Sequence, residues 1–272
     1  MAKPTTLNAV LTEREEYATG LVVMRIAPDG WPLPSFVPGQ FATIGLPASA
    51  PRVPGSDPED PGASPDRFIR RAYSIASSSK QHEYVELFVA LVTSGELTPR
   101  LLALTAGDRL WLGPKFTGMF TLREIPADQN LVMIATGTGL APYMSMLRTE
   151  LLGASRRKIA LLLGARHSWD LGYSRELFTM QRESKDLTVL RIVSRPREER
   201  QPWAGLAGHV QHLWSGGALA EAWGEKPTPE DTHVLVCGNP AMIDDMTRLL
   251  VSEGFRVHEK GAPGQIHVEK YW

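Results

Sequence analysis

The stretch Leu131–Arg148 decides which fold the second half of the chain adopts, and it reads L-V-M-I-A-T-G-T-G-L-A-P-Y-M-S-M-L-R. An apolar run, two glycines and a segment with helical periodicity follow one another, which predicts a buried strand, a tight turn and a helix. Gly137 and Gly139 have no Cβ atoms, so a pyrophosphate can approach the backbone and meet the N–H groups at the start of the helix. The stretch therefore favours a nucleotide-binding unit, although a T-G-T-G turn can also be an ordinary connection between a strand and a helix.

Towards the C-terminus, apolar runs of strand length alternate with segments of helical periodicity. This alternation is typical of βαβ units and predicts a parallel sheet. The last helix has a clear start, with Asn239 as its cap and Pro240 as its first residue. The expected strands are residues 131–136, 159–163, 188–193 and 233–237.

Towards the N-terminus, the pattern changes to short runs in which apolar and polar residues alternate. About six such runs fall within the first 115 residues, which predicts a small antiparallel β-barrel. Thr98 is expected to cap a short helix that begins at Pro99 and turns apolar side chains inward. The runs lie within residues 8–46, 71–76, 85–91 and 108–112.

Residues 47–66 interrupt this strand pattern with six prolines and almost no large apolar side chain. A segment of this composition cannot pack a core, so it is predicted to be a mobile loop. Strand-like residues resume directly after it, which argues against a linker between domains. The loop either shapes the access of a partner or is surface that the fold tolerates, and the second is favoured because loop length costs little entropy.

The length of 272 residues allows two domains, each with its own core. Helix and strand signals are both poor between Phe116 and Gln129, so the expected domains are residues 1–122 and 123–272. The 29 basic and 30 acidic residues give a net charge of −1, which provides no overall field for nucleic acid. A partner must therefore be recognised by a local patch.

Cys237 is the one cysteine of the sequence. A single cysteine excludes an intramolecular disulfide framework and an iron–sulfur cluster with four cysteine ligands from this chain. Redox chemistry would need another carrier. The sequence has no apolar stretch typical of a signal peptide or a membrane span, so a cytoplasmic protein without a membrane partner is expected.

Two further stretches offer ligand-binding chemistry. Arg71 and Tyr73 lie two residues apart on a predicted strand and therefore face the same side. A guanidinium and a planar ring on one face suit a phosphate and an aromatic cofactor, but a surface ion pair is the alternative. Cys237 ends the last predicted strand and Gly238 follows it, at the carboxyl edge where parallel sheets bind ligands, although a lone cysteine is usually a small buried hydrophobe.

With these motifs in this order, the chain resembles the ferredoxin–NADP(+) reductase family in its bacterial type. The resemblance covers nearly the whole chain, and each motif is short. The matching stretches are R-A-Y-S at Arg71–Ser74, G-E-L-T at Gly95–Thr98, G-T-G-L-A-P at Gly137–Pro142, C-G-N-P at Cys237–Pro240 and V-E-K-Y-W at Val268–Trp272.

The resemblance implies that residues 1–122 form a barrel that binds FAD non-covalently. Arg71 would pair with the FAD pyrophosphate, Tyr73 would pack on the flavin, and Ser74 would lie beside flavin N5. The aromatic tail would return to the FAD, with Tyr271 on the isoalloxazine ring and Trp272 on the adenine. The implied FAD-binding residues are Arg71, Ala72, Tyr73, Ser74, Gly95, Glu96, Leu97, Thr98, Tyr271 and Trp272.

Residues 123–272 would form the NADP(H)-binding α/β domain. Two arginines that the family places near the 2′-phosphate match Arg166 and Arg195, whereas a third is His209 here. An imidazole is mostly neutral at pH 7, so the expected preference for NADPH is weaker than with three arginines. The implied NADPH-binding residues are Gly137, Thr138, Gly139, Arg166, Arg195, His209, Cys237 and Gly238, and the implied catalytic residues are Ser74, Cys237, Glu269 and Tyr271.

The resemblance thus implies an FAD-dependent oxidoreductase that transfers electrons between NADPH and a one-electron carrier, ferredoxin or flavodoxin, and that acts as a monomer. One alternative with the same chemistry is an NAD(P)H-dependent flavin reductase component of an oxygenase system. An alternative of another class is a regulatory module that binds nucleotides without catalysis, because a fold does not guarantee a function.

Overall fold

The computed structural model describes residues 6–59, 67–151 and 157–270, and the chain divides into two compact units. The first unit comprises Met1–Thr121 together with Met144–Thr149, and the second comprises Leu122–Tyr143 together with Glu150–Trp272. The expected division after residue 122 puts residues 144–149 in the second part, whereas their contacts place them in the first unit.

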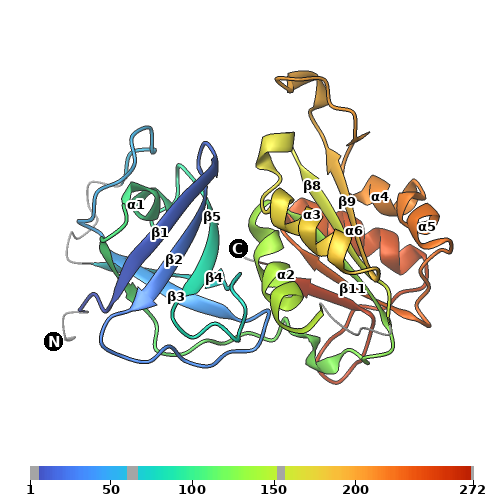
Figure 1. Ribbon diagram of the computed structural model, residues 1–272, viewed down its shortest axis with the longest axis horizontal. Coiled ribbons are helices and arrows are strands. Elements are labelled where there is room, and N and C mark those ends of the chain that lie inside the picture. Colours follow the sequence, from blue (N-terminus) through green and yellow to red (C-terminus); the bar gives the residue numbers. More distant parts are fainter. Residues whose placement is uncertain (1–5, 60–66, 152–156, 271–272) are drawn as a thin grey trace. The chain divides into compact units, whose positions relative to one another are not determined.

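The first unit is built on six antiparallel strands (Figure 1). Their order in the sheet is β4-β3-β6-β1-β2-β5, and a bridge between Ile75 and Leu87 joins the end of β4 to β5. Contact between the two outer strands closes the sheet, so the predicted antiparallel barrel is confirmed. The strands are β1 Ala9–Ala18, β2 Leu21–Pro28, β3 Phe41–Pro47, β4 Phe68–Ser74, β5 Val85–Ala90 and β6 Arg109–Leu112.

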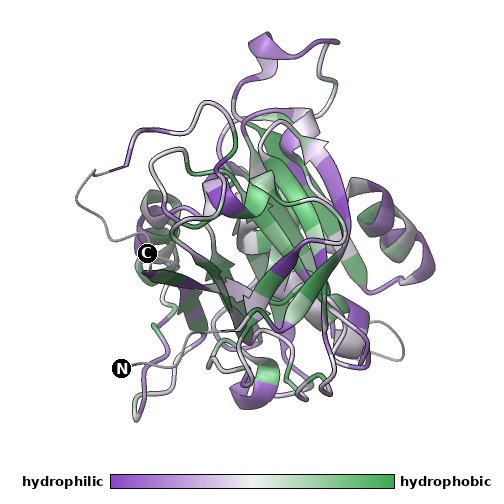
Figure 2. Ribbon diagram, turned by 90° about the vertical axis from the view of Figure 1, so that its left-hand side faces the viewer, coloured by the Kyte–Doolittle hydropathy of each residue, from purple (hydrophilic) through white to green (hydrophobic). Residues whose placement is uncertain are grey.

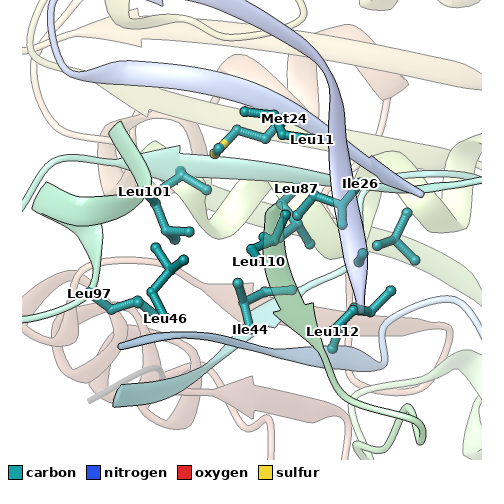
Figure 3. Close-up of a cluster of buried hydrophobic side chains, with 14 of the residues drawn as sticks. Leu11, Met24, Ile26, Ile44, Leu46, Leu87, Leu97, Leu101, Leu110 and Leu112 are labelled. Atoms are coloured by element: carbon teal, nitrogen blue, oxygen red, sulfur yellow. The ribbon is translucent and has the colours of Figure 1, made fainter. Parts of the chain in front are cut away.

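Alternate residues of these strands fill the barrel interior, as the period of two along a strand requires. Figure 3 shows Leu11, Met24, Ile44, Leu87 and Leu110 pointing towards one another from five different strands. The short helix α1, Thr98–Ala103, adds to this core through Leu101, and Leu97 joins the core from the residue before the helix.

The prediction that Thr98 caps α1 is wrong. The cap position is Leu97, whose side chain is 2% exposed and belongs to the barrel core. The need to bury this leucine fixes where the helix begins, and Thr98 becomes its first residue. The Thr98 hydroxyl instead accepts a hydrogen bond from the Val92 N–H at 3.0 Å and donates one to the Val92 carbonyl at 3.2 Å, which closes the preceding turn.

The prediction that the proline-rich segment cannot pack on a core is wrong for residues 47–59, the described part of it. Val53 packs on the barrel core, and its N–H donates to the Pro99 carbonyl at 2.9 Å. The Asp57 N–H donates to the Thr93 carbonyl at 3.0 Å. Residues 60–66 lie outside the described residues.

The second unit contains a parallel sheet of six strands in the order β10-β9-β8-β7-β11-β12. The predicted parallel sheet is therefore confirmed, and the two edge strands, β10 and β12, are additional to the four expected. Successive strands run outward from β7 on one side and from β11 on the other, so the topological switch point lies between β7 and β11. The strands are β7 Asn130–Thr136, β8 Ile159–Ala165, β9 Leu187–Val193, β10 Leu206–Ala207, β11 Thr232–Cys237 and β12 Ile266–Glu269.

Helices cover both faces of this sheet. Apolar residues of α4, α5 and α6 pack with Val132, Ile134, Ala160 and Val234 on one face. The strands of this sheet are mostly hydrophobic (Figure 2). Asn239 caps α6 as predicted, because its side chain accepts from two backbone N–H groups of the first turn. The helices are α2 Ala141–Met146, α3 Ser174–Glu183, α4 Gln211–Ser215, α5 Ala218–Trp223 and α6 Pro240–Ser252, with a π turn at Leu147–Leu151 and 3₁₀ turns at Leu122–Glu124, Gly137–Leu140, Ser168–Asp170 and Pro196–Glu198.

Among the described helices, none has the length and apolar character needed to cross a membrane.

Candidate functional site

The first group of candidate residues lies on and beside β4 of the barrel. Arg71 is exposed, and its guanidinium donates to Glu96 Oε2 at 2.6 Å and to the Arg70 carbonyl at 2.7 Å. Tyr73 follows on the same side of the strand and is half-buried, and its burial raises the pKa of the phenol well above the usual value. The next residue, Ser74, is buried, whereas Ala72 is exposed. The strand therefore places a cation and an aromatic ring side by side.

The turn before α1 brings a second set of polar groups to Arg71. Glu96 accepts hydrogen bonds from Arg67 and Arg71, and these contacts, that of Arg67 first, lower the pKa of its carboxyl group. The backbone N–H groups of Glu96, Leu97 and Thr98 have no hydrogen-bond partner among the described residues. Three N–H donors and a guanidinium form a donor set suited to a pyrophosphate. An anion bound there must compete with Glu96 for Arg71.

The second group lies at the carboxyl ends of β7 and β11, at the switch point of the parallel sheet. Gly137 has a φ of +55°, and no other group lies within 4 Å of where its Cβ would be. Gly139 differs, because a Cβ there would lie 2.3 Å from the Cys237 carbonyl oxygen. Of these two glycines, Gly137 leaves open space for a ligand, whereas at position 139 the packing leaves no room for a side chain. Thr138 is half-buried between them.

Gly238 completes this close approach from the β11 side. It has a φ of +140°, and a Cβ there would lie 2.3 Å from Thr136 Oγ1. The same Thr136 oxygen accepts a hydrogen bond from the Asn239 N–H at 2.9 Å. The sequence did not indicate a role for Thr136. Its partner Asn239 lies 103 residues away, and no local pattern marks the last residue of a strand as one that makes such a contact.

Cys237 and Glu269 are neighbours in the paired strands β11 and β12. Cys237 is buried and Glu269 half-buried. Tyr143, which the sequence did not single out, lies fully buried close to both, and its hydroxyl donates to the Ile134 carbonyl at 3.2 Å. Burial, with smaller contributions from Cys237 and Glu269, raises the pKa of this phenol well above its usual value. Tyr271 and Trp272 lie outside the described residues.

The third group lies at the carboxyl ends of β8, β9 and β10. The Arg195 N–H donates to the Arg166 carbonyl at 2.9 Å, and Gly208, next to His209, donates to the end of β9 at 2.8 Å. Arg166, Arg195 and His209 are all exposed. The fold therefore brings these three residues, which are far apart in sequence, to one edge of the sheet.

Two carboxylates that the sequence did not single out, Glu198 and Asp170, lie at this edge. Glu198 accepts from Arg195 at 3.4 Å and lies 3.0 Å from His167 Nε2, while Asp170 lies 3.1 Å from His167 Nδ1. The bond to Glu198, followed by that to Asp170, raises the pKa of His167 above its ordinary value. Trp169 stacks on the His167 ring with centroids 4.5 Å apart.

Comparisons with known proteins agree with this arrangement. Residues 133–248 match the family described as the oxidoreductase NAD-binding domain. The chain is 30% identical over 243 residues to a flavodoxin/ferredoxin–NADP reductase of Buchnera aphidicola subsp. Baizongia pistaciae, covering 89% of this chain and 90% of the relative. A ferredoxin–NADP reductase of Azotobacter vinelandii is 30% identical over 240 residues, covering 86% of each. The chain belongs to the ferredoxin–NADP reductase family.

Solved structures show the same fold as this member of the reductase family. A ferredoxin–NADP(+) reductase from Neisseria gonorrhoeae with bound FAD and NADP matches with a TM-score of 0.79 at 24% identity, covering 97% of this chain and 98% of that chain. The Amycolatopsis cytochrome P450 reductase GcoB matches with a TM-score of 0.72 at 27% identity, covering 97% of this chain and 69% of that chain. The barrel and the parallel sheet are therefore the two-domain fold of the family.

The close contact between the carboxyl ends of β7 and β11 predicts how a substitution at Gly238 changes stability. Gly238→Ala is expected to lower the free energy of unfolding by about 3 kcal/mol, because the methyl group adds a backbone clash to a φ that L-residues avoid. Gly224→Ala is the matched control, since Gly224 has a φ of +74° and no group within 4 Å of its Cβ position. It should lose only about 1 kcal/mol. Urea unfolding measures both, and equal losses would contradict the packing argument.

The carboxylates around His167 yield a pH prediction. His167 should titrate above the ordinary histidine pKa of about 6.5, because Glu198 and Asp170 stabilise its protonated form. These ion pairs stabilise the folded protein fully below about pH 6.5 and lose their effect as the pH rises through the higher folded-state pKa. NMR titration of the imidazole measures this value, and Glu198→Gln should lower it. A His167 pKa unchanged by Glu198→Gln would contradict the contact.

Proposed function

We propose that this protein is an FAD-dependent reductase that transfers electrons between NADPH and a one-electron carrier protein of the ferredoxin or flavodoxin kind. The observation that carries the proposal is that one chain holds two separate candidate sites for phosphate. One is formed by Arg71 and the turn at 95–98 on the barrel, and the other lies at the carboxyl edge of the parallel sheet. A barrel site and a sheet site suit two different dinucleotides.

In the proposed reductase the barrel holds FAD without a covalent bond. Arg71 pairs with the pyrophosphate, and the N–H groups of residues 96–98 complete the phosphate contacts. Tyr73 packs on the flavin and Ser74 supplies a polar group beside it. The side chain of Leu97 belongs to the barrel core, so this residue contributes only its backbone. Tyr271 and Trp272 are proposed to stack on the FAD, as the family resemblance implies.

The parallel sheet of the proposed reductase holds NADPH. Gly137 and Thr138 admit the pyrophosphate at the switch point, and Arg166, Arg195 and His209 bind the 2′-phosphate. Cys237 and Glu269 lie beside the nicotinamide. Bound FAD supplies the chemistry, because a flavin accepts a hydride and can release electrons one at a time. The protein's own residues orient the rings and exclude water, and hydride transfer requires no general base.

The first test of the proposal concerns Arg71. Arg71→Ala should purify largely colourless, because loss of a charge-assisted contact to a phosphate costs about 2 kcal/mol, or about 30-fold in Kd. The visible absorption of the purified protein measures flavin content. Arg109→Ala is the control, since Arg109 is an exposed arginine of the same barrel that pairs with Asp29. A variant at Arg71 that retains full flavin would overturn the assignment of the barrel site.

The oxygenase-reductase alternative is favoured by one observation, the imidazole of His209 at the position of the third family arginine. The alternative predicts that NADH serves as well as NADPH. Nucleotide preference therefore separates the two functions, since the dinucleotides differ only by the 2′-phosphate.

The second test concerns this preference. Arg195→Ala should lower kcat/KM for NADPH by about 10- to 100-fold and leave that for NADH within about twofold, because only the contact to the 2′-phosphate is removed. Arg248→Ala is the control, since Arg248 pairs with Asp245 three residues away just as Arg195 pairs with Glu198. Equal losses with both nucleotides, or a wild-type preference for NADH, would favour the oxygenase-reductase function.

A further inference from the structure

We propose that Arg52, Glu59 and Arg100 form a positioning network that aims the backbone N–H groups of residues 96 and 97 at the FAD pyrophosphate. The proline-rich segment Pro47–Glu59 is thereby part of the phosphate site rather than tolerated surface. This inference rests on the proposed function, because it assigns a role to the segment within the FAD site.

Arg100 is the centre of the network. It lies on α1, its side chain is 2% exposed, and its guanidinium donates in three directions. Nη1 and Nη2 form a bidentate pair with the Glu59 carboxylate at 2.7 and 2.6 Å. Nη1 also donates to the Glu96 carbonyl at 2.7 Å, and Nε donates to the Ala48 carbonyl at 3.2 Å. A planar fork with five donors suits this set of acceptors, whereas a lysine ammonium does not.

Arg52 holds the same turn through two backbone carbonyls. Its Nη2 donates to the Thr93 carbonyl at 3.2 Å and to the Gly95 carbonyl at 3.3 Å. Its Nη1 donates to the Asp57 carbonyl, and its Nε lies 4.0 Å from Glu59. Glu59 thus stands between two arginines, and the hydrogen bond from Arg100 is the main cause of the lowered pKa of its carboxyl group.

These contacts fix the direction of two peptide groups. In a trans peptide the C=O of one residue and the N–H of the next point in opposite directions. Arg52 holds the Gly95 carbonyl and Arg100 holds the Glu96 carbonyl, so the N–H groups of Glu96 and Leu97 point away from the network. Neither N–H group has a hydrogen-bond partner among the described residues. They are the donors that the proposed function assigns to the pyrophosphate.

These contacts orient two carbonyl groups, and that effect is distinct from stabilising the fold. The Glu59–Arg100 pair is weak support for stability, because removing the Arg100 charge from water offsets much of its attraction to the more exposed Glu59. The same ion pair can nevertheless hold the turn before α1 in one conformation. A positioning role and a merely structural role therefore differ in whether loss of the pair weakens FAD binding beyond any loss of stability.

The test compares Glu59→Gln with Glu15→Gln in the full-length protein after removal of its flavin. Glu15 is an exposed carboxylate on β1, so the control makes the same chemical change outside the network. Glu59→Gln should raise the Kd for FAD about tenfold or more, measured by quenching of flavin fluorescence. It should also reduce the rise in Tm that a fixed FAD concentration produces, whereas Glu15→Gln should leave both values unchanged.

Several results would overturn the inference. An unchanged Kd in Glu59→Gln, or an equal loss of Tm with and without FAD, would show that the network only stabilises the fold. A second measurement uses the wild-type protein alone, in case the variant does not fold. Hydrogen exchange at residues 96 and 97 should be fast without FAD and slow with it, and unchanged exchange would also overturn the inference. Failure of the wild-type chain to bind FAD would instead refute the proposed function.

Discussion

The close approach of the carboxyl ends of β7 and β11 is the constraint on which the nucleotide-binding unit depends. Gly139 and Gly238 each occupy a position where a Cβ would lie 2.3 Å from an atom of the opposite strand end or loop. The absence of side chains at these two positions lets the strand ends come into contact. At Gly137, in contrast, no other group lies within 4 Å of where a Cβ would be, so its backbone is open to a ligand. The two glycines of the T-G-T-G turn thus have different roles, one in packing and one in exposing the backbone.

The sequence predicted the fold class, but not the contacts that join distant segments. The barrel, the parallel sheet and the Asn239 cap follow from local periodicity and capping chemistry, which act over a few residues. The Glu59–Arg100 pair spans 41 residues, and no local pattern reveals it. The composition of the proline-rich segment does not predict its contacts for the same reason, since Arg52 bonds to the turn at residues 93–95 and Glu59 to the buried Arg100. The Thr98 cap failed because tertiary burial of Leu97 outweighed a local preference.

The candidate site residues show the same division. Arg71, Tyr73, Gly137 and Arg195 could be found from motifs, because ligand chemistry restricts residue types at short spacing. Tyr143 and Thr136 could not, because an ordinary helical tyrosine and an ordinary strand threonine acquire their roles only from what the fold places beside them. Whether the motif residues bind FAD and NADPH stays a prediction, which the variants at Arg71 and Arg195 test.

Carboxylates accompany both candidate phosphate sites, and this bears on how each would bind. Glu96 pairs with Arg71 on the barrel, and Glu198 pairs with Arg195 on the sheet. A phosphate that reaches either arginine therefore exchanges with a carboxylate instead of meeting an uncompensated cation. Because the exchange replaces one ion pair by another, its net free energy is smaller than that of a new ion pair, and the phosphate gains mainly through its additional oxygens and the backbone N–H groups. On the barrel, where residues 96–98 offer such N–H groups, affinity then depends on how well these donors are oriented, and in the proposed network the buried Arg100 sets that orientation.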